Sequence, residues 1–148
     1  MTTIQTIQDQ LAPFLSEWGT PEPNHLAAIL SSENLQDAVR VLYNDHQIYL
    51  IAITGIDNGV EANTFEVLYH FGMDARVLTL RVTIDRVEAM IPSICGIYPY
   101  ASPFERETGE MFGITFVDTP DTTRLFLPDD WEEGSYPLRK DAELKGVQ

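Results

Sequence analysis

The sequence is poor in cysteine, in basic residues and in long apolar runs. A single cysteine, Cys95, excludes a disulfide within the chain and every iron–sulfur or zinc-thiolate site built by this chain alone, because those sites need several cysteines. Only 9 Lys and Arg face 23 Asp and Glu, which gives a formal net charge of −14. That charge argues against binding to nucleic acid or to an anionic membrane, because both surfaces repel an acidic protein.

No apolar stretch reaches the roughly 20 residues that a membrane-spanning helix needs. The first ten residues lack the basic region and apolar run of a secretory signal, and with no disulfide possible the sequence favours an intracellular protein. What is present is ordinary for a globular domain. The 148 residues, 44% of them hydrophobic and 22% charged, suffice for one domain with a substantial core.

The first third of the chain predicts two helices and one strand. A first helix is expected to end near Gly19 and to be kinked or divided at Pro13. Residues 25–30 predict a short strand. Ser32 is then expected to cap a second helix that ends at residues 44–45. The apolar faces of these two helices would be Ile4, Ile7, Leu11, Leu15 and Trp18 in the first, and Leu35, Ala38, Val39, Leu42 and Tyr43 in the second.

Three strand-like runs follow in the middle of the chain. Residues 48–56 are nearly all apolar, which predicts a central strand covered on both faces. Residues 64–71 and 78–84 alternate between apolar and polar side chains, and residues 72–75 between them suit a hairpin connection. The short links favour an antiparallel meander, with the helices before and after it covering one face.

A sharp helix signal opens at Ser102. The serine is expected as the N-cap, Pro103 at the first helical position, and Glu105 as the partner that completes a capping box. Gly113 is the expected C-terminal stop, and residues 114–116 predict a short strand. The predicted fold class is α+β in two layers, with one mostly antiparallel mixed sheet, helices mainly on one face and an extended C-terminal tail. We expect a core domain over residues 1–118 and an interaction tail over residues 119–148.

Few residues of the sequence suit catalysis or metal binding. Glu105 and Glu107 point to different sides of a helix, so capping and ion pairing are favoured over a pair of catalytic carboxylates. The three histidines, His25, His46 and His70, lack metal-ligand spacing. The glycines form neither a dinucleotide-binding fingerprint nor a phosphate-binding loop. Cys95 is interpreted as a buried thiol, with a nucleophile that meets His70 in space as the alternative.

The C-terminal tail carries large apolar side chains on a segment that predicts little regular structure. Trp, Tyr and Arg, the residue types that anchor protein interfaces, all occur in it. Two interpretations stay open: the tail folds back over its own sheet, or it covers a partner. The apolar side chains are Leu125, Phe126, Leu127, Trp131, Tyr136 and Leu138.

A set of motifs in this half of the chain resembles a known family. It resembles the signature of the C subunit of the respiratory NADH:quinone oxidoreductase (complex I), a family that includes the matching subunit of membrane-bound energy-converting NiFe hydrogenases. Glu110 stands where complex I members usually carry Asp, which is closer to the hydrogenase branch. The motifs, in order, are Glu105-Arg106-Glu107, Met111-Phe112-Gly113-Ile114, Pro120-Asp121, Arg124-Leu125, Leu127-Pro128-Asp129-Asp130-Trp131 and Pro137-Leu138-Arg139-Lys140-Asp141.

The resemblance implies a cofactor-free structural subunit of a peripheral arm on the cytoplasmic face of a membrane. Such a subunit packs on the large, D-type subunit beside iron–sulfur subunits, and the clusters (with NiFe in a hydrogenase) belong to those partners. The remaining alternatives are a small acidic carboxylate-dependent enzyme and a regulatory binding module. The residues expected at the partner interface are Arg124, Trp131, Tyr136, Leu138, Arg139, Lys140 and Asp141, and those expected in a structural motif are Glu105, Arg106, Glu107 and Gly113.

Overall fold

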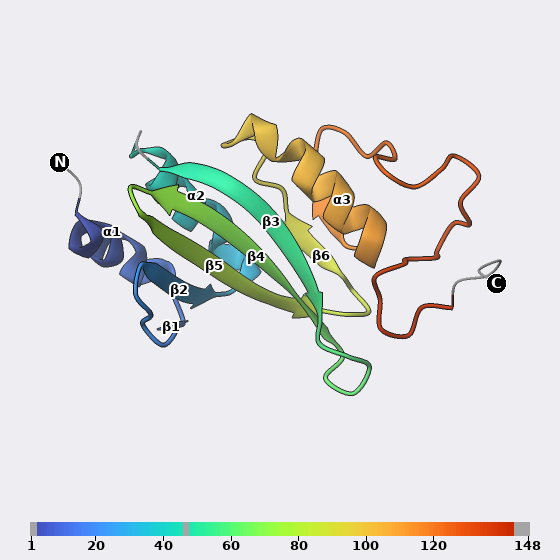
Figure 1. Cartoon of the computed structure of the whole chain (residues 1–148), viewed down its shortest axis with the longest axis horizontal. Coiled ribbons are helices and arrows are strands. Elements are labelled where there is room, and N and C mark those ends of the chain that lie inside the picture. Colours follow the sequence, from blue (N-terminus) through green and yellow to red (C-terminus); the bar gives the residue numbers. More distant parts are fainter. Residues whose placement is uncertain (1–2, 46–47, 144–148) are drawn as a thin grey trace.

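The structure is a computed structural model that describes residues 3–45 and 48–143 (Figure 1). Helix α1 spans Ile4–Leu11, and the Thr3 hydroxyl caps it by accepting from the Thr6 N–H. The expected division at Pro13 is confirmed, but the helix does not resume and so does not reach Gly19. The chain turns into a 3₁₀ segment around Pro13, whose missing N–H cannot continue an α-helix, and Trp18 lies instead in the short strand β1, Glu17–Trp18.

The next elements are strand β2, His25–Leu30, and helix α2, Leu35–Tyr43, both as predicted. The predicted cap was wrong: Ser32 lies inside a 3₁₀ turn, and Asn34 stands at the N-cap without a side-chain hydrogen bond. Tyr43 was expected on the buried face of α2 but is 49% exposed. It lies at the last turn of the helix, where its ring meets that of Tyr98 edge to face.

The predicted antiparallel meander is confirmed. It consists of β3, Tyr49–Asp57, β4, Thr64–Met73, and β5, Arg76–Asp85, and a two-residue turn joins β4 to β5. Strand β2 pairs with β5 in parallel, so that the five strands stand in the order β1-β2-β5-β4-β3. The sheet is therefore mixed but mostly antiparallel, and the α+β class is confirmed.

Strand β3 is an edge strand, which corrects the prediction of a central strand covered on both faces. Its Tyr49 and Ile51 are 55% and 41% exposed. The apolar run arises for a different reason. One face of β3 packs under a helix, while on the other face the Tyr49 ring covers Gly72 of β4, where any side chain would collide with it.

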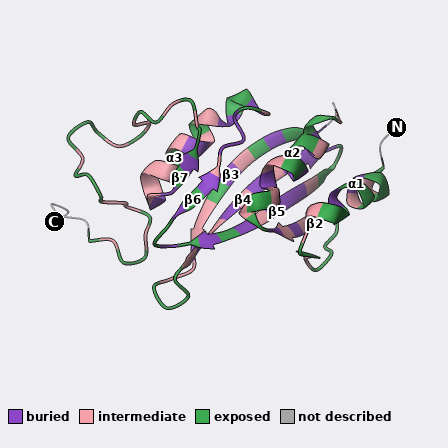
Figure 2. Ribbon diagram, turned by 180° about the vertical axis from the view of Figure 1, so that it is seen from behind, coloured by how far each residue is buried: buried purple, intermediate pink, exposed green. Residues whose placement is uncertain are grey.

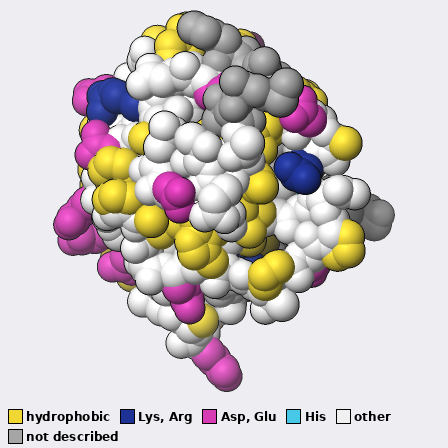
Figure 3. All heavy atoms as spheres, turned by 90° about the vertical axis from the view of Figure 1, so that its left-hand side faces the viewer, with side chains coloured by type: hydrophobic (Ala, Val, Ile, Leu, Met, Phe, Trp, Pro, Cys, Tyr) yellow, Lys and Arg dark blue, Asp and Glu magenta, His cyan; other side chains and the backbone are white. Residues whose placement is uncertain are grey.

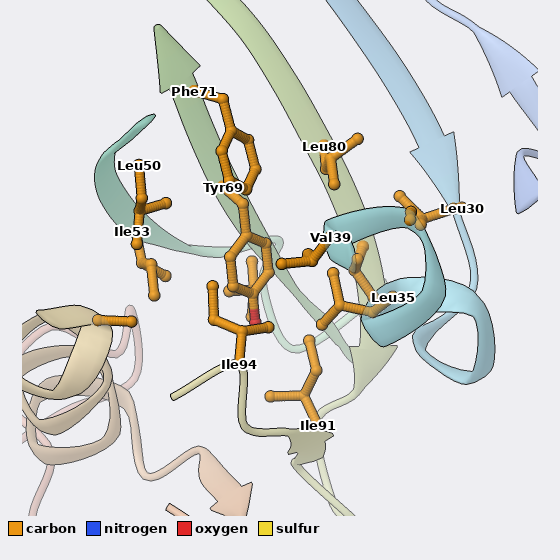
Figure 4. Close-up of a cluster of buried hydrophobic side chains, with 14 of the residues drawn as sticks. Leu30, Leu35, Val39, Leu50, Ile53, Tyr69, Phe71, Leu80, Ile91 and Ile94 are labelled. Carbon is orange, nitrogen blue, oxygen red and sulfur yellow. The ribbon is translucent and has the colours of Figure 1, made fainter. Parts of the chain in front are cut away.

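The core lies between one face of the sheet and the helices (Figure 2). The alternation of β4 and β5 places Phe65, Val67, Tyr69 and Phe71 on this face together with Leu78, Leu80, Val82 and Ile84, as predicted. Helices α1 and α2 cover it side by side. The Tyr69 ring points from β4 toward Ile94 and Val39 of the covering layer (Figure 4). Burial of this continuous apolar surface is the main source of the fold's stability.

The second half begins with β6, Met90–Pro92, which pairs in parallel with β7, Thr115–Val117. Between them stands helix α3, Ser102–Phe112, which ends at Gly113 with φ 76°, as predicted. Helix α3 packs on β3 over Gly55, on the core face of the sheet. After Val117 the described part of the tail, residues 118–143, contains no helix or strand.

The predicted capping box of α3 is wrong. Ser102 is the first residue of the helix rather than its N-cap, and Ala101 at the N-cap makes no side-chain hydrogen bond. A 3₁₀ turn, Pro99–Ala101, leads directly into the helix, and the Ser102 N–H donates to the Pro99 carbonyl. Glu105 therefore does not cap the helix, and its side chain is buried in the protein.

Candidate partner interface

Glu105 organises a buried polar cluster beside α3. Its side chain is 1% exposed, and its carboxylate accepts hydrogen bonds from the Ser93 hydroxyl at 2.7 Å and the Ile94 N–H at 2.8 Å. The Cys95 thiol donates a third, at 3.2 Å. These donors replace the water lost on burial. Glu105 thus ties α3 to the segment after β6.

Cys95 is a buried thiol, as the sequence predicted. Burial raises the pKa of its thiol, and the neighbouring Glu105 carboxylate raises it further, while the Ser93 hydrogen bond acts in the opposite direction. His70 is no partner for it. The imidazole lies on the other face of β4, where its Nδ1 is 2.9 Å from the Thr79 hydroxyl. Cys95 and His70 therefore do not form a nucleophilic pair.

The tail is held to α3 at its start by two side chains, which we name the first tail anchor: Arg106 and Glu110. The Arg106 guanidinium donates to the Thr123 carbonyl and hydroxyl and to the Arg124 carbonyl, each at 3.0 Å, and lies 3.6 Å from the Asp121 carboxylate. The first tail anchor fixes the direction in which the tail leaves the core.

Glu110 contributes the other half of the first tail anchor. Its carboxylate accepts from three successive backbone N–H groups, those of Leu125 at 3.2 Å, Phe126 at 2.9 Å and Leu127 at 3.2 Å. Backbone N–H groups that converge in this way form an anion-binding nest. The clamp holds Phe126 with 64% of its surface exposed. An ordered, exposed aromatic side chain of this kind suits a protein interface.

Arg124 shapes the tail itself. Its guanidinium donates to the Pro128 carbonyl at 3.0 Å and to the Trp131 carbonyl at 2.8 Å, and the Trp131 indole N–H donates to the Ser135 carbonyl at 2.9 Å. The residues expected to meet a partner therefore also bond within the chain. These contacts hold the tail to its own chain and use guanidinium and indole donors. The other interpretation, that the tail covers a partner, stays a prediction.

The second tail anchor consists of Asp57, Arg86, Arg139 and Asp141. Arg86 is 7% exposed and forms ion pairs with the buried Asp57 carboxylate and, at 2.6 Å, with Asp141 of the tail. Asp57 also accepts from the Lys140 N–H at 2.8 Å. Although burial raises the pKa of Asp57, the bonds from Arg86, Lys140 and Gly59 hold it below its ordinary value. The pair links the ends of β3 and β5 to the tail.

Arg139 completes the second tail anchor. Its Nε donates to the Phe112 carbonyl at 2.6 Å, and its guanidinium stacks over the rings of Phe65 and Tyr136, 5.1 and 4.6 Å from their centroids. Gly113 makes this approach possible, since a Cβ there would stand 2.5 Å from the Tyr136 ring. The left-handed turn that ends α3 is thus also the place where Tyr136 and Arg139 of the tail pack against the core.

The structure divides the seven residues predicted for the interface into three groups. Arg124, Trp131 and Tyr136 line a groove between α3 and the tail, whereas Arg139 and Asp141 belong to the second tail anchor. The remaining two, Leu138 and Lys140, have exposed side chains. Of the predicted structural motif, Glu105 and Arg106 bond to other segments, Gly113 forms the left-handed turn after α3, and Glu107 is exposed.

Sequence reasoning missed three residues that hold the tail: Asp57, Arg86 and Glu110. Each is an acid or base that contacts a segment distant in the chain, so spacing within one helix or strand gives no sign of it. The only signal was Asp57 itself, a carboxylate that closes an apolar strand. A charge in that position needs a buried partner.

The structure offers no metal site in its described residues, 3–45 and 48–143, where no group of three or more His, Cys, Asp or Glu side chains converges. His25 and His70 do approach each other, but both bond to the Thr79 hydroxyl on the uncovered face of the sheet. His46 lies outside the described residues. No helix in the described ranges is long and apolar enough to span a bilayer.

Comparison with known proteins identifies the family. The sequence profile described as "Respiratory-chain NADH dehydrogenase, 30 Kd subunit" matches residues 28–148, which include α2, α3, the whole meander and the tail. The chain belongs to this family. It is 36% identical over 125 residues to the C subunit of the NADH-quinone oxidoreductase of Roseiflexus sp. (strain RS-1), covering 80% of this chain and 70% of that relative.

The same family extends to a hydrogenase protein. The chain is 32% identical over 123 residues to hydrogenase-4 component G of Escherichia coli (strain K12), which covers 81% of this chain but 22% of that protein. It spans 48% of the corresponding NADH-quinone oxidoreductase protein of Maricaulis maris (strain MCS10), at 45% identity. The family resemblance stated from the sequence, the complex I subunit with its hydrogenase counterparts, is confirmed.

Solved structures share the 30 kDa subunit fold. One chain of the membrane-bound sulfane sulfur reductase, an archaeal respiratory membrane complex, superposes with a TM-score of 0.81 over 96% of this chain and 84% of its own, at 24% identity. The trypsin-resistant fragment of Nqo5 superposes with a TM-score of 0.61 over 79% of this chain and 96% of the fragment, at 20% identity. At these identities the likeness extends to the fold.

Proposed function

We propose that this chain is a structural subunit of the peripheral arm of a complex I-type NADH:quinone oxidoreductase. In this role it carries no redox group of its own and packs on the large, D-type subunit, supporting electron transfer that is coupled to ion translocation. We place it on the cytoplasmic face of the membrane, next to the iron–sulfur subunits. Membership of the 30 kDa subunit family is the observation that carries the proposal.

The architecture of the tail supports an assembly role. A segment of 26 described residues without helix or strand, 118–143, would be costly to order in water unless its contacts compensate. Two anchors order it before any partner arrives, which lowers the entropic cost of association. The ordered tail also presents two apolar side chains to solvent, Phe126 at 64% and Leu138 at 55% exposure, as expected of side chains that a partner covers.

The test is co-purification with the large subunit of the same organism. The 148-residue chain and a variant lacking residues 120–148 are each co-expressed with a tagged large subunit. We expect the unshortened chain to be retained and the shortened chain to be lost. Circular dichroism of the shortened chain serves as the control that its sheet still forms. Retention of a folded, shortened chain at the level of the unshortened one would contradict the assignment of the interface to the tail.

A second candidate is the equivalent subunit of an energy-converting NiFe hydrogenase. It is favoured by the similarity to hydrogenase-4 component G and by Glu110 before Met111 and Phe112. The two candidates differ in the partner. Metal analysis of the purified complex decides between them, because a hydrogenase complex contains stoichiometric nickel, whereas an NADH:quinone oxidoreductase contains none and oxidises NADH.

A further inference from the structure

A groove separates helix α3 from the middle of the tail. Its volume is about 530 Å³, and we name it the tail groove. Residues of α3 and β7, among them Arg106 and Glu110, form one wall. The other wall is the tail, with Trp131, Glu133 and Tyr136. In Figure 1 the tail runs out from β7, passes along α3 at a distance and returns near its C-terminal end.

The tail groove is held open by bonds at both of its ends. The Glu110 clamp fixes residues 125–127, and at the far end the Leu138 N–H donates to the Met111 carbonyl at 3.1 Å. Between these points the Arg124 guanidinium holds the Pro128 and Trp131 carbonyls. A groove that is ordered in this way before binding loses little entropy when it is filled.

The lining of the tail groove is acidic. Five carboxylates line it against two guanidinium groups. Groups of both signs bond within the chain, Arg106 and Arg124 to tail carbonyls and Glu110 to three backbone N–H groups, so the balance of the lining stays negative by three charges. The field inside the groove therefore favours a cation. The carboxylates are Glu105, Glu110, Asp121, Glu132 and Glu133.

Aromatic rings add a second recognition element for a cation. Trp131 and Tyr136 stand in the same wall as Glu133. The protein already uses one of these rings in that way, since the Arg139 guanidinium lies 4.6 Å from the centroid of Tyr136. Rings of Trp and Tyr attract guanidinium and ammonium groups through their electron-rich faces, and their surfaces also pack against the aliphatic stem of such a side chain.

We propose that the tail groove receives an Arg or Lys side chain of the large subunit. This inference rests on the proposed function and names the chemistry that its interface would use. Trp131 supplies the apolar wall, and Glu132 and Glu133 supply the charge that attracts the incoming cation. The exposed Phe126, outside the groove, contacts the partner next to it.

The sequence provides a matched control for this proposal. Asp129 and Asp130 precede Trp131 as Glu132 and Glu133 follow it, and all four are exposed acids of the tail, but only the glutamates line the groove. Chains of all 148 residues carrying Glu132→Gln with Glu133→Gln, or Asp129→Asn with Asp130→Asn, lose the same charge. Affinity for the purified large subunit is measured for each at low and high salt. Thermal unfolding of each free chain serves as the folding control.

We expect the glutamate variant to bind the large subunit about tenfold more weakly and with a shallower salt dependence, and the aspartate variant to stay near wild type. A Trp131→Phe variant, which keeps an aromatic wall, is expected to bind more tightly than Trp131→Ala. Equal affinities of the two charge variants would overturn the groove proposal while leaving the proposed function intact. Failure of the wild-type chain to bind the large subunit would overturn both.

Discussion

At the scale of single residues, the protein stabilises the few charges that it buries with fixed partners. Asp57 and Arg86 are 4% and 7% exposed and bond to each other and to the tail. Breaking such a pair leaves an uncompensated buried charge, which costs about 3 kcal/mol or more. The second tail anchor is therefore a point where a conservative substitution has consequences for both the core and the tail.

Asp57→Asn is expected to lower the free energy of unfolding at neutral pH and to make it less sensitive to acid. Bonds from Arg86, Lys140 and Gly59 outweigh the effect of burial and lower the pKa of Asp57 in the folded state. Its stabilising contribution is thus present above the ordinary value of 3.8 and is lost as pH falls through the lowered folded value. Urea unfolding between pH 7 and pH 3 measures this. An equal loss of stability with acid in variant and wild type would contradict it.

Gly113→Ala is expected to cost more than the same change at Gly134. Both glycines have left-handed backbones, with φ of 76° and 78°, so both substitutions incur a strain of about 1 kcal/mol. Only at Gly113 would the new methyl group also collide with Tyr136 and Arg139. The measurements are the free energy of unfolding and the rate of tryptic cleavage in the tail, which we expect to rise for Gly113→Ala alone. Equal effects at both sites would show that the contact is unimportant.

Cys95 is expected to react slowly with thiol reagents in the folded protein. Burial, with Glu105 nearby, raises the pKa of its thiol, so little thiolate is present at pH 8, and the sulfur is shielded from solvent. Alkylation followed by mass spectrometry in native buffer and in urea measures the difference. The urea sample is the control for reagent quality. Rapid labelling of the native chain would contradict the buried cluster.

At the scale of elements, sequence patterns correctly predicted those features that depend on residues close together in the chain. The alternation of residues 64–71 and 78–84 placed both strands correctly, and Gly113 correctly ended α3. The errors occurred where distant contacts decide. Residues 48–56 suggested a central strand because the sequence does not reveal that Tyr49 covers Gly72 at a sheet edge. Glu105 suggested a cap because its partners come from the segment after β6.

The same limit applies to the candidate site. The tail motifs identified the region and several of its groove residues, including Trp131 and Tyr136. Glu110 was known only as a family variation, since its three bonding partners are backbone groups 15 to 17 positions away. Every residue except proline has a backbone N–H, so the sequence does not mark which N–H groups bond to Glu110. The clamp becomes visible only when α3 and the tail are placed side by side.

Gly55→Ala tests how closely α3 packs on β3. A Cβ at Gly55 would lie 2.6 Å from the Phe112 ring, so the helix must shift, at a cost of about 1–3 kcal/mol. Gly96→Ala is the control, because nothing lies within 4 Å of a Cβ there. We expect a lower free energy of unfolding for Gly55→Ala and little change for Gly96→Ala. Full stability of Gly55→Ala would mean that α3 is seated more loosely than the structure has it.

At the scale of the whole molecule, the formal net charge of −14 arises from an excess of acids that are mostly exposed. Figure 3 shows acidic side chains scattered over one face with few basic ones among them. Exposed ion pairs such as Arg40 with Asp37 contribute little. We therefore propose that residues 1–118 form a core domain whose acidic surface faces water, and that residues 119–148 act as the interaction tail.

This distribution predicts that added salt stabilises the protein. Repulsion among like charges destabilises a compact state, and raising NaCl from about 0.02 to 0.5 M shortens the Debye length from roughly 20 Å to about 4 Å. The buried Asp57–Arg86 pair is screened little, so the net effect is expected to be a melting temperature several degrees higher. Glu61→Lys, an exposed reversal in the β3–β4 turn, should melt higher at low salt and respond less to salt. A melting temperature that falls with salt would mean that surface ion pairs outweigh the repulsion.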